Sequence, residues 1–176
     1  DESRPDQRDS ADLAWLLHLR ALWELGESAT VELGGSWLAG RNGLDRLSQV
    51  FAADLTMKWR PVSAERYRGW DWTTEIVAVD RGGATVDRRR SGAYTALRGQ
   101  FAQRWWLQAR GALLGLPGDD GGRGWRTEGL LALVPSETSA LRLQYAFERP
   151  SSGGPTIHEA FLQFIVSIGS HPSHSY

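Results

Sequence analysis

Strict alternation of apolar and polar residues is the feature that most constrains the fold of this chain. In the segment 157–176, the even positions from Ala160 to Ile168 are apolar, and the same parity continues to the terminal Tyr176. On an extended strand these residues form one continuous apolar face. The segment is therefore predicted to be a β-strand with one apolar and one more polar face.

The same alternation recurs along the chain, in segments separated by polar, Gly-containing or Pro-containing stretches. It is found at 13–25, 29–39, 50–60, 70–79, 93–101, 104–113, 125–133, 141–148 and 157–176. In the first segment, Leu16 and Leu22 also place apolar residues three and four positions apart, as in a helix. A helix is therefore the alternative for this segment. We expect about nine strands, most of them near the ~9–11 residues that a tilted strand needs to cross a bilayer.

Composition narrows the class of protein. No run of about 18 apolar residues is present, which excludes a membrane-spanning helix but not a transmembrane barrel, whose hydrophobicity is hidden in alternation. Nine Trp and 20 Gly suit membrane interfaces and turns in a barrel wall. The absence of Cys excludes disulfides and thiolate chemistry, and a net charge of -1 argues against a nucleic-acid partner.

The connections between the segments also alternate, between short and long. Short turns are expected at 26–28, near Gln103 and at 134–139, and longer polar loops at 40–49, 80–92, 116–124 and 149–156. Outer-membrane barrels have short periplasmic turns and longer external loops; the segment 61–69 is an exception. The predicted fold is all-β, an antiparallel up-and-down transmembrane β-barrel formed by residues 13–176. Residues 1–12 are expected to be a flexible loop, and the odd strand count predicts the C-terminal fragment of a longer chain.

Three segments carry a resemblance to a known family: DLTMKWRPVSAERYRGWDWTTE, VPSETSALRLQY and FLQFIVSIGSHPSHSY. Together they resemble the C-terminal part of a family of Gram-negative outer-membrane proteins. Members are described as porin-like or as zinc-regulated TonB-dependent receptors and end in a G-x-H-x-x-H-x-aromatic tail, here Gly169, His171, His174 and Tyr176. The resemblance covers residues 54–176, and the first fifty residues match only in pattern.

The resemblance implies a location in the outer membrane and a part in the passage of small solutes or metal species. Its implied partners are outer-membrane lipid, lipopolysaccharide and the barrel-assembly machinery, which would engage the C-terminal strand. Dependence on TonB would require a plug and an energy-coupling box, neither of which is found in this sequence. Arg88, Arg89 and Arg90 lie in an expected external loop, where they would either pair with lipopolysaccharide phosphates or be simply solvated.

Charged residues occupy the face opposite the apolar rows and are the candidate pore-lining set. They are Arg20, Glu24, Glu32, Asp54, Lys58, Asp71, Glu75, Arg98, Arg104, Arg110, Arg126, Glu128 and Arg142. A charge at the lipid-facing midplane costs about 2–4 kcal/mol, so these residues should face water or one another. Two roles remain open: tuning ion selectivity in a polar lumen, or neutralising one another as a structural wall.

Aromatic residues on the apolar rows are mostly near strand ends, as expected for girdles at the membrane interfaces. They are Trp15, Trp23, Trp37, Trp59, Trp70, Trp72, Trp105, Trp125 and Tyr176. Trp106 has the opposite parity and is expected to point inward.

Histidines provide the candidate metal ligands. His158, His171 and His174 would share a zinc ion if the turn at Pro172 brought them together. The alternative is a polar tail that holds no metal.

No enzyme is expected, because the sequence has no G-x-S-x-G, H-E-x-x-H or phosphate-loop motif. The alternative function is a soluble all-β module, a sandwich or lipocalin-like barrel that binds a ligand or carbohydrate. Such a module needs bulky apolar rows for its core. Here Gly35, Gly99, Gly111 and Gly129 interrupt the rows, which favours the membrane barrel.

Overall fold

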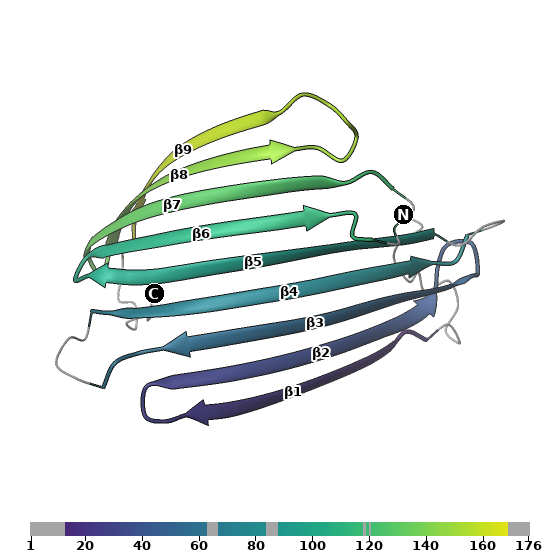
Figure 1. The fold of residues 1–176 in the computed structure, drawn as a ribbon, viewed down its shortest axis with the longest axis horizontal. Coiled ribbons are helices and arrows are strands. Elements are labelled where there is room, and N and C mark those ends of the chain that lie inside the picture. Colours follow the sequence, from purple (N-terminus) through teal and green to yellow (C-terminus); the bar gives the residue numbers. More distant parts are fainter. Residues whose placement is uncertain (1–12, 63–66, 84–87, 118, 120, 169–176) are drawn as a thin grey trace.

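The chain folds into one antiparallel sheet of nine strands in which each strand pairs with its neighbours in sequence (Figure 1). The computed structural model describes residues 13–62, 67–83, 88–117, 119 and 121–168. The strands are β1 (Trp15–Leu25), β2 (Ala29–Arg41), β3 (Leu47–Trp59), β4 (Gly69–Arg81), β5 (Arg88–Ala102), β6 (Trp105–Leu114), β7 (Gly124–Ser136), β8 (Ser139–Arg149) and β9 (Ile157–Val166). The all-β, up-and-down prediction is confirmed. Strands β1 and β9 are the two edges, so the sheet is open.

Strand β1 decides between the two interpretations of the first segment. It pairs with β2 along its whole length, from Trp15 opposite Ala39 to Leu25 opposite Ala29. The helical alternative is therefore wrong. Leu16 and Leu22 are on the face opposite Trp15 and Trp23, because successive side chains of a strand alternate between faces.

The connections at two places are shorter than expected, because the strands continue into polar residues. The loop expected at 40–49 is reduced to residues 42–46 between β2 and β3. Arg88, Arg89 and Arg90 belong to β5 and not to a loop, which corrects the expectation for this segment. Arg89 pairs across the sheet with Asp80 at 3.7 Å between Nε and Oδ1, and such opposite charges stabilise the extension.

The turn expected at 134–139 is likewise shorter, because β7 continues through Pro135 to Ser136. The register between β7 and β8 shifts between Leu133 and Ser136. A bulge of this kind accommodates a proline that has no N–H for the ladder. Only residues 137 and 138 then connect the two strands.

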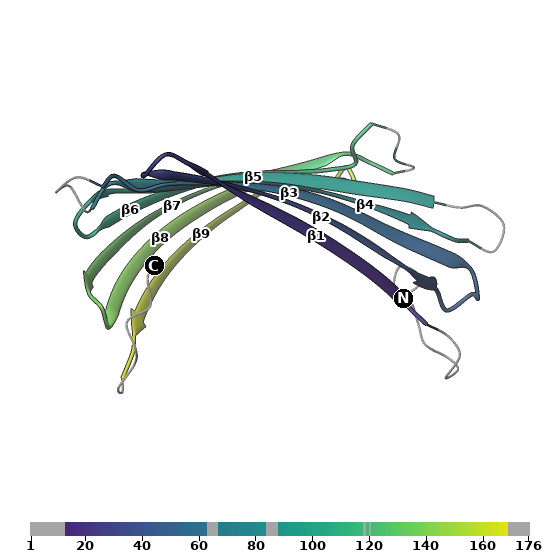
Figure 2. The same cartoon turned by 90° about the horizontal axis from the view of Figure 1, so that it is seen from below.

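The sheet is twisted and strongly curved, so that it forms an arch when viewed along its edge (Figure 2). Its two faces differ in exposure. On the apolar face Leu107 and Leu143 are each 55% exposed, whereas on the opposite face the side chains of Asp71 and Glu128 are only 12% and 16% exposed. Side chains converge on the inside of a curved sheet, so the charged face is the concave one.

The buried apolar residues of the described chain are all small. They are Ala39, Ala132, Ala140 and Ala146. Large apolar side chains are instead exposed in every strand, including Trp15, Leu33, Phe51 and Leu162. A single sheet whose large apolar residues are exposed has no conventional protein core.

The end of the sheet opposite the short turns is held together by Asn42, which is 1% exposed. Its Nδ2 donates to Ser48 Oγ at 3.0 Å and to the carbonyl of Gly82 at 2.6 Å. Its Oδ1 accepts the backbone N–H of Leu44 at 2.9 Å. These bonds join the β2–β3 connection to the end of β4.

Candidate functional site: the charged face

The register of the sheet places nearly all of the candidate pore-lining residues on one face. Successive Cα pairings connect Arg20, Glu24, Glu32, Asp54, Lys58, Asp71, Glu75, Arg98, Arg110, Arg126, Glu128 and Arg142 in rows of the same parity. Arg104 is the exception, because it precedes β6 in the turn after β5. We call the surface formed by the others, with their neighbours of like parity, the charged face.

The strongest interaction on the charged face is centred on Arg126 in β7. Its Nε is 2.6 Å from Glu128 Oε1, its Nη1 2.7 Å from Glu148 Oε2 and its Nη2 2.6 Å from Glu159 Oε2. The planar guanidinium presents its donors in a fixed fork, which suits several carboxylates at once. This cluster joins β7, β8 and β9 by charge-assisted hydrogen bonds.

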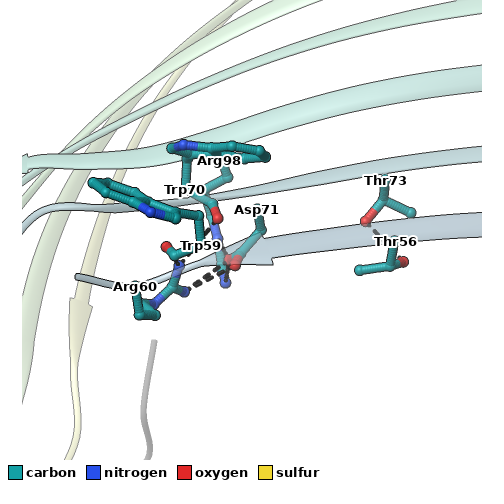
Figure 3. Close-up of polar contacts among 7 residues, drawn as sticks. All are labelled: Thr56, Trp59, Arg60, Trp70, Asp71, Thr73 and Arg98. Carbon is teal, nitrogen blue, oxygen red and sulfur yellow. Dashed lines mark hydrogen bonds and ion pairs between the residues drawn. The ribbon is translucent and has the colours of Figure 1, made fainter. Parts of the chain in front are cut away.

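A second cluster surrounds Asp71 near the turn between β3 and β4 (Figure 3). Asp71 Oδ2 accepts from Arg98 Nη2 at 2.7 Å, and Asp71 Oδ1 is 2.9 Å from Arg60 Nη2. Arg60 also donates to the carbonyls of Trp59 and Trp70. The guanidinium of Arg98 is 5.4 Å from the centre of the Trp106 ring. Trp106 is thus on the charged face, as its parity predicts, and supports a cation there.

Like charges are adjacent in the middle of the face. Asp54 in β3 is directly opposite Glu75 in β4, and Glu75 is directly opposite Tyr94 in β5. The Asp54 carboxylate is over Gly34, where a Cβ would overlap it. Among the residues that the structure describes, neither carboxylate has a cation within ion-pair distance.

Two further pairs complete the face. Arg110 places its guanidinium 4.7 Å from the centre of the Tyr94 ring. Arg20 pairs with Glu32 at 3.1 Å near the β1 edge. Arginine and carboxylate side chains therefore follow the concave face from β1 to β9. The facing pair of Asp54 and Glu75 has no cation partner among the described residues, but Tyr94 donates a side-chain hydrogen bond to Glu75.

Some partners within these clusters were missed by the sequence analysis. Glu148 and Glu159 both bind Arg126, and Arg60 binds Asp71. Glu148 has the parity of Arg142, so alternation places it on the charged face. Alternation does not fix the register between strands, so it could not predict the contact between Arg126 and Glu148.

The predicted interface aromatics lie on the apolar face in two bands. Trp23, Trp59, Trp70, Trp72 and Trp105 are near the short turns, and Trp15, Trp37 and Trp125 are near the opposite rim. On β3, Phe51 and Trp59 mark the two bands and are eight residues apart, which is ~26 Å along a strand. This separation is of the order of the ~25 Å apolar band of an outer-membrane barrel. Tyr176 lies outside the described residues.

His158 is on the apolar face, at the start of β9. Its Nδ1 is 2.6 Å from the Tyr145 hydroxyl, and its ring meets Phe147 edge-on with centroids 4.9 Å apart. His171 and His174 themselves lie outside the described residues.

Among the residues that the structure describes, no group of three or more potential ligands could hold a metal ion. The described chain also has no helix that is long and apolar enough to span a membrane. No protein-family model, curated protein or solved structure matches this chain.

At the rim opposite the short turns, Asp119 fastens the β6–β7 connection to β5. Ser91 donates to its two carboxylate oxygens, through Oγ at 2.5 Å and through the backbone N–H at 2.7 Å. These hydrogen bonds hold the pKa of Asp119 below its ordinary value. The connection is thereby anchored more strongly while this carboxylate is charged.

Proposed function

We propose that this chain forms part of the wall of a β-barrel in the outer membrane of a Gram-negative bacterium. Its concave charged face would line a water-filled lumen through which small solutes or metal species pass. The chain would act as a transport protein and carry out no catalysis. The family resemblance of residues 54–176 supports the same location and role.

The observation that carries the proposal is the difference between the two faces of a single sheet. Most of the exposed large apolar side chains are on one face, and ion pairs occupy the other. Within the described residues, no helix or second sheet is present to cover the apolar face. In water this surface would aggregate, whereas in a bilayer it is the surface that lipid solvates.

Membrane partitioning of the full-length protein tests the location. We expect it in the outer-membrane fraction, resistant to alkaline carbonate and soluble only with detergent. A protein that stays monomeric in detergent-free buffer would contradict the membrane location and support the soluble ligand-binding module instead.

Conductance across planar bilayers tests the role of the charged face. Arg110→Glu should change the ratio of cation to anion permeability, because Arg110 is on the concave face. Arg104→Glu is the matched comparison: Arg104 is in a turn, and its reversal should have a smaller effect. An unchanged ratio in the Arg110 variant would count against a lumen-lining role.

A further inference from the structure

A groove of about 1270 Å³ crosses the apolar face of β4 to β7, towards the short-turn end of the sheet. Gly99, Ala109 and Gly111 line its floor, and Trp72 and Leu107 are among its larger lining side chains. Trp72 Nε1 donates to Thr95 Oγ1 at 2.8 Å, which fixes the position of its ring.

The glycines in this groove are not required by packing. A Cβ on Gly111 would meet nothing within 4 Å. A Cβ on Gly99 would make only ordinary contacts, 3.6 Å from the Gly69 carbonyl and 3.8 Å from Trp70 Cβ. A Cβ would therefore fit at both positions, and the small residues leave a space that the protein itself does not fill.

The length of the groove suits one alkyl chain. From Thr95 to Gly99 the floor extends four residues along β5, ~13 Å, which approaches half of the ~30 Å hydrocarbon thickness. The groove also reaches Arg68, Trp59 and Trp70 at the short-turn end. An arginine beside interfacial tryptophans is at the depth of lipid phosphates and has the complementary charge.

A second copy of the chain fits this groove less well. The groove is on the outside of the arch, and two convex surfaces touch only along a line. The wall of another barrel could not follow the groove floor, whereas a flexible alkyl chain can.

We propose that the groove binds one phospholipid, with an alkyl chain along Gly99, Ala109 and Gly111 and its phosphate at Arg68. This site rests on the proposed membrane location, since only an apolar face exposed to lipid would meet the ligand. It adds a specific lipid-binding site to the wall, distinct from the charged face.

Native mass spectrometry of the full-length protein in detergent, titrated with dioleoyl phosphatidylglycerol, tests the site. The wild type should retain one lipid, and Gly111→Leu should weaken binding about tenfold by filling the groove. Gly35→Leu is the matched control: Gly35 is on the same face but in β2, where a Cβ comes no closer than 4.0 Å to Ala52 O. It should bind as the wild type does. Equal binding by both variants would overturn the proposal.

Arg68→Gln tests the phosphate contact and should weaken binding about fivefold at low salt. Arg41→Gln, at the opposite rim, should leave binding unchanged. If Gly111→Leu does not fold, as judged by circular dichroism, Ala109→Leu fills the same groove and replaces it. A protein that enters the outer membrane but retains no lipid would overturn the groove site alone. A protein that stays soluble would overturn the membrane location first, and the groove site with it.

Discussion

Two regions of the charged face differ in whether their carboxylates are bound by a cation. In β7 to β9, Arg126 binds Glu128, Glu148 and Glu159 at 2.6 to 2.7 Å. In β3 and β4, Asp54 and Glu75 are directly opposite one another, and within the described chain no cation pairs with either.

This difference separates the two roles that charge on a barrel wall can have. Carboxylates that are bound by a cation at short distance hold strands together, and their charge is partly offset. Uncompensated charges cost stability but attract counter-ions. In the proposed barrel, the Arg126 cluster would therefore have a structural role, and the Asp54–Glu75 pair would select which solutes pass.

Removal of the Arg126 side chain should have the largest effect. Arg126→Ala leaves several carboxylates adjacent without their cation, and we expect a loss of ~2 kcal/mol in unfolding free energy, below the range for fully buried pairs because the side chain is 29% exposed. Urea denaturation in detergent measures this loss. Arg142→Ala, on the same face, should cost less than about 0.5 kcal/mol. Equal losses would show that the cluster has no special structural role.

Neutralising the uncompensated pair should change selectivity more than stability. In the variant Asp54→Asn/Glu75→Gln, the permeability ratio of cations to anions should fall at least about fivefold, because one charge at ~4 Å in water contributes ~1 kcal/mol, which is about a fivefold change in a ratio. Single-channel reversal potentials in a salt gradient measure the ratio. Glu148→Gln removes a single carboxylate that is bound by Arg126 and should have a smaller effect. The reverse order would refute the division of roles.

Relief of like-charge repulsion should make one of these variants more stable than the wild type. Because Glu75 is directly opposite Asp54, Glu75→Gln should raise the unfolding free energy by ~0.5 kcal/mol. The same urea titration measures the gain. A loss of stability would mean that Glu75 makes a favourable interaction that offsets the repulsion.

The smallest effect concerns Asp119, a carboxylate that is stabilised mainly by hydrogen bonds from Ser91. Because the pKa of Asp119 is lowered in the fold, its stabilising contribution is present above the ordinary value of 3.8 and is lost as pH falls through the lower folded value. The Ser91 amide resonance should shift in that range. In Asp119→Asn no such transition should occur. The Gly115 amide, which donates to the Ser91 carbonyl at 2.9 Å, is the internal reference.

Alternation along the sequence was sufficient to predict the all-β class, about nine strands and the face on which nearly all of the candidate charges lie; Arg104 is the exception. The physical reason is local: in an extended chain, successive side chains point to opposite faces whatever the strand pairs with. Strand ends were predicted less well. Arg88 to Arg90 were expected in a loop, because the cross-strand contact of Arg89 with Asp80 is not visible in the sequence.

Which charges meet was decided only by the tertiary structure. Arg126 contacts Glu159 across two strand pairings, and Asp54 is opposite Glu75. Both depend on the register, because several registers would keep the same residues on each face and the backbone hydrogen bonds fix only one of them. A register shift of two residues would keep every apolar row intact and yet separate both pairs. The sequence by itself therefore determined the two surfaces of this protein. The pairing of its strands determined which carboxylates of the charged surface are bound by a cation and which are not.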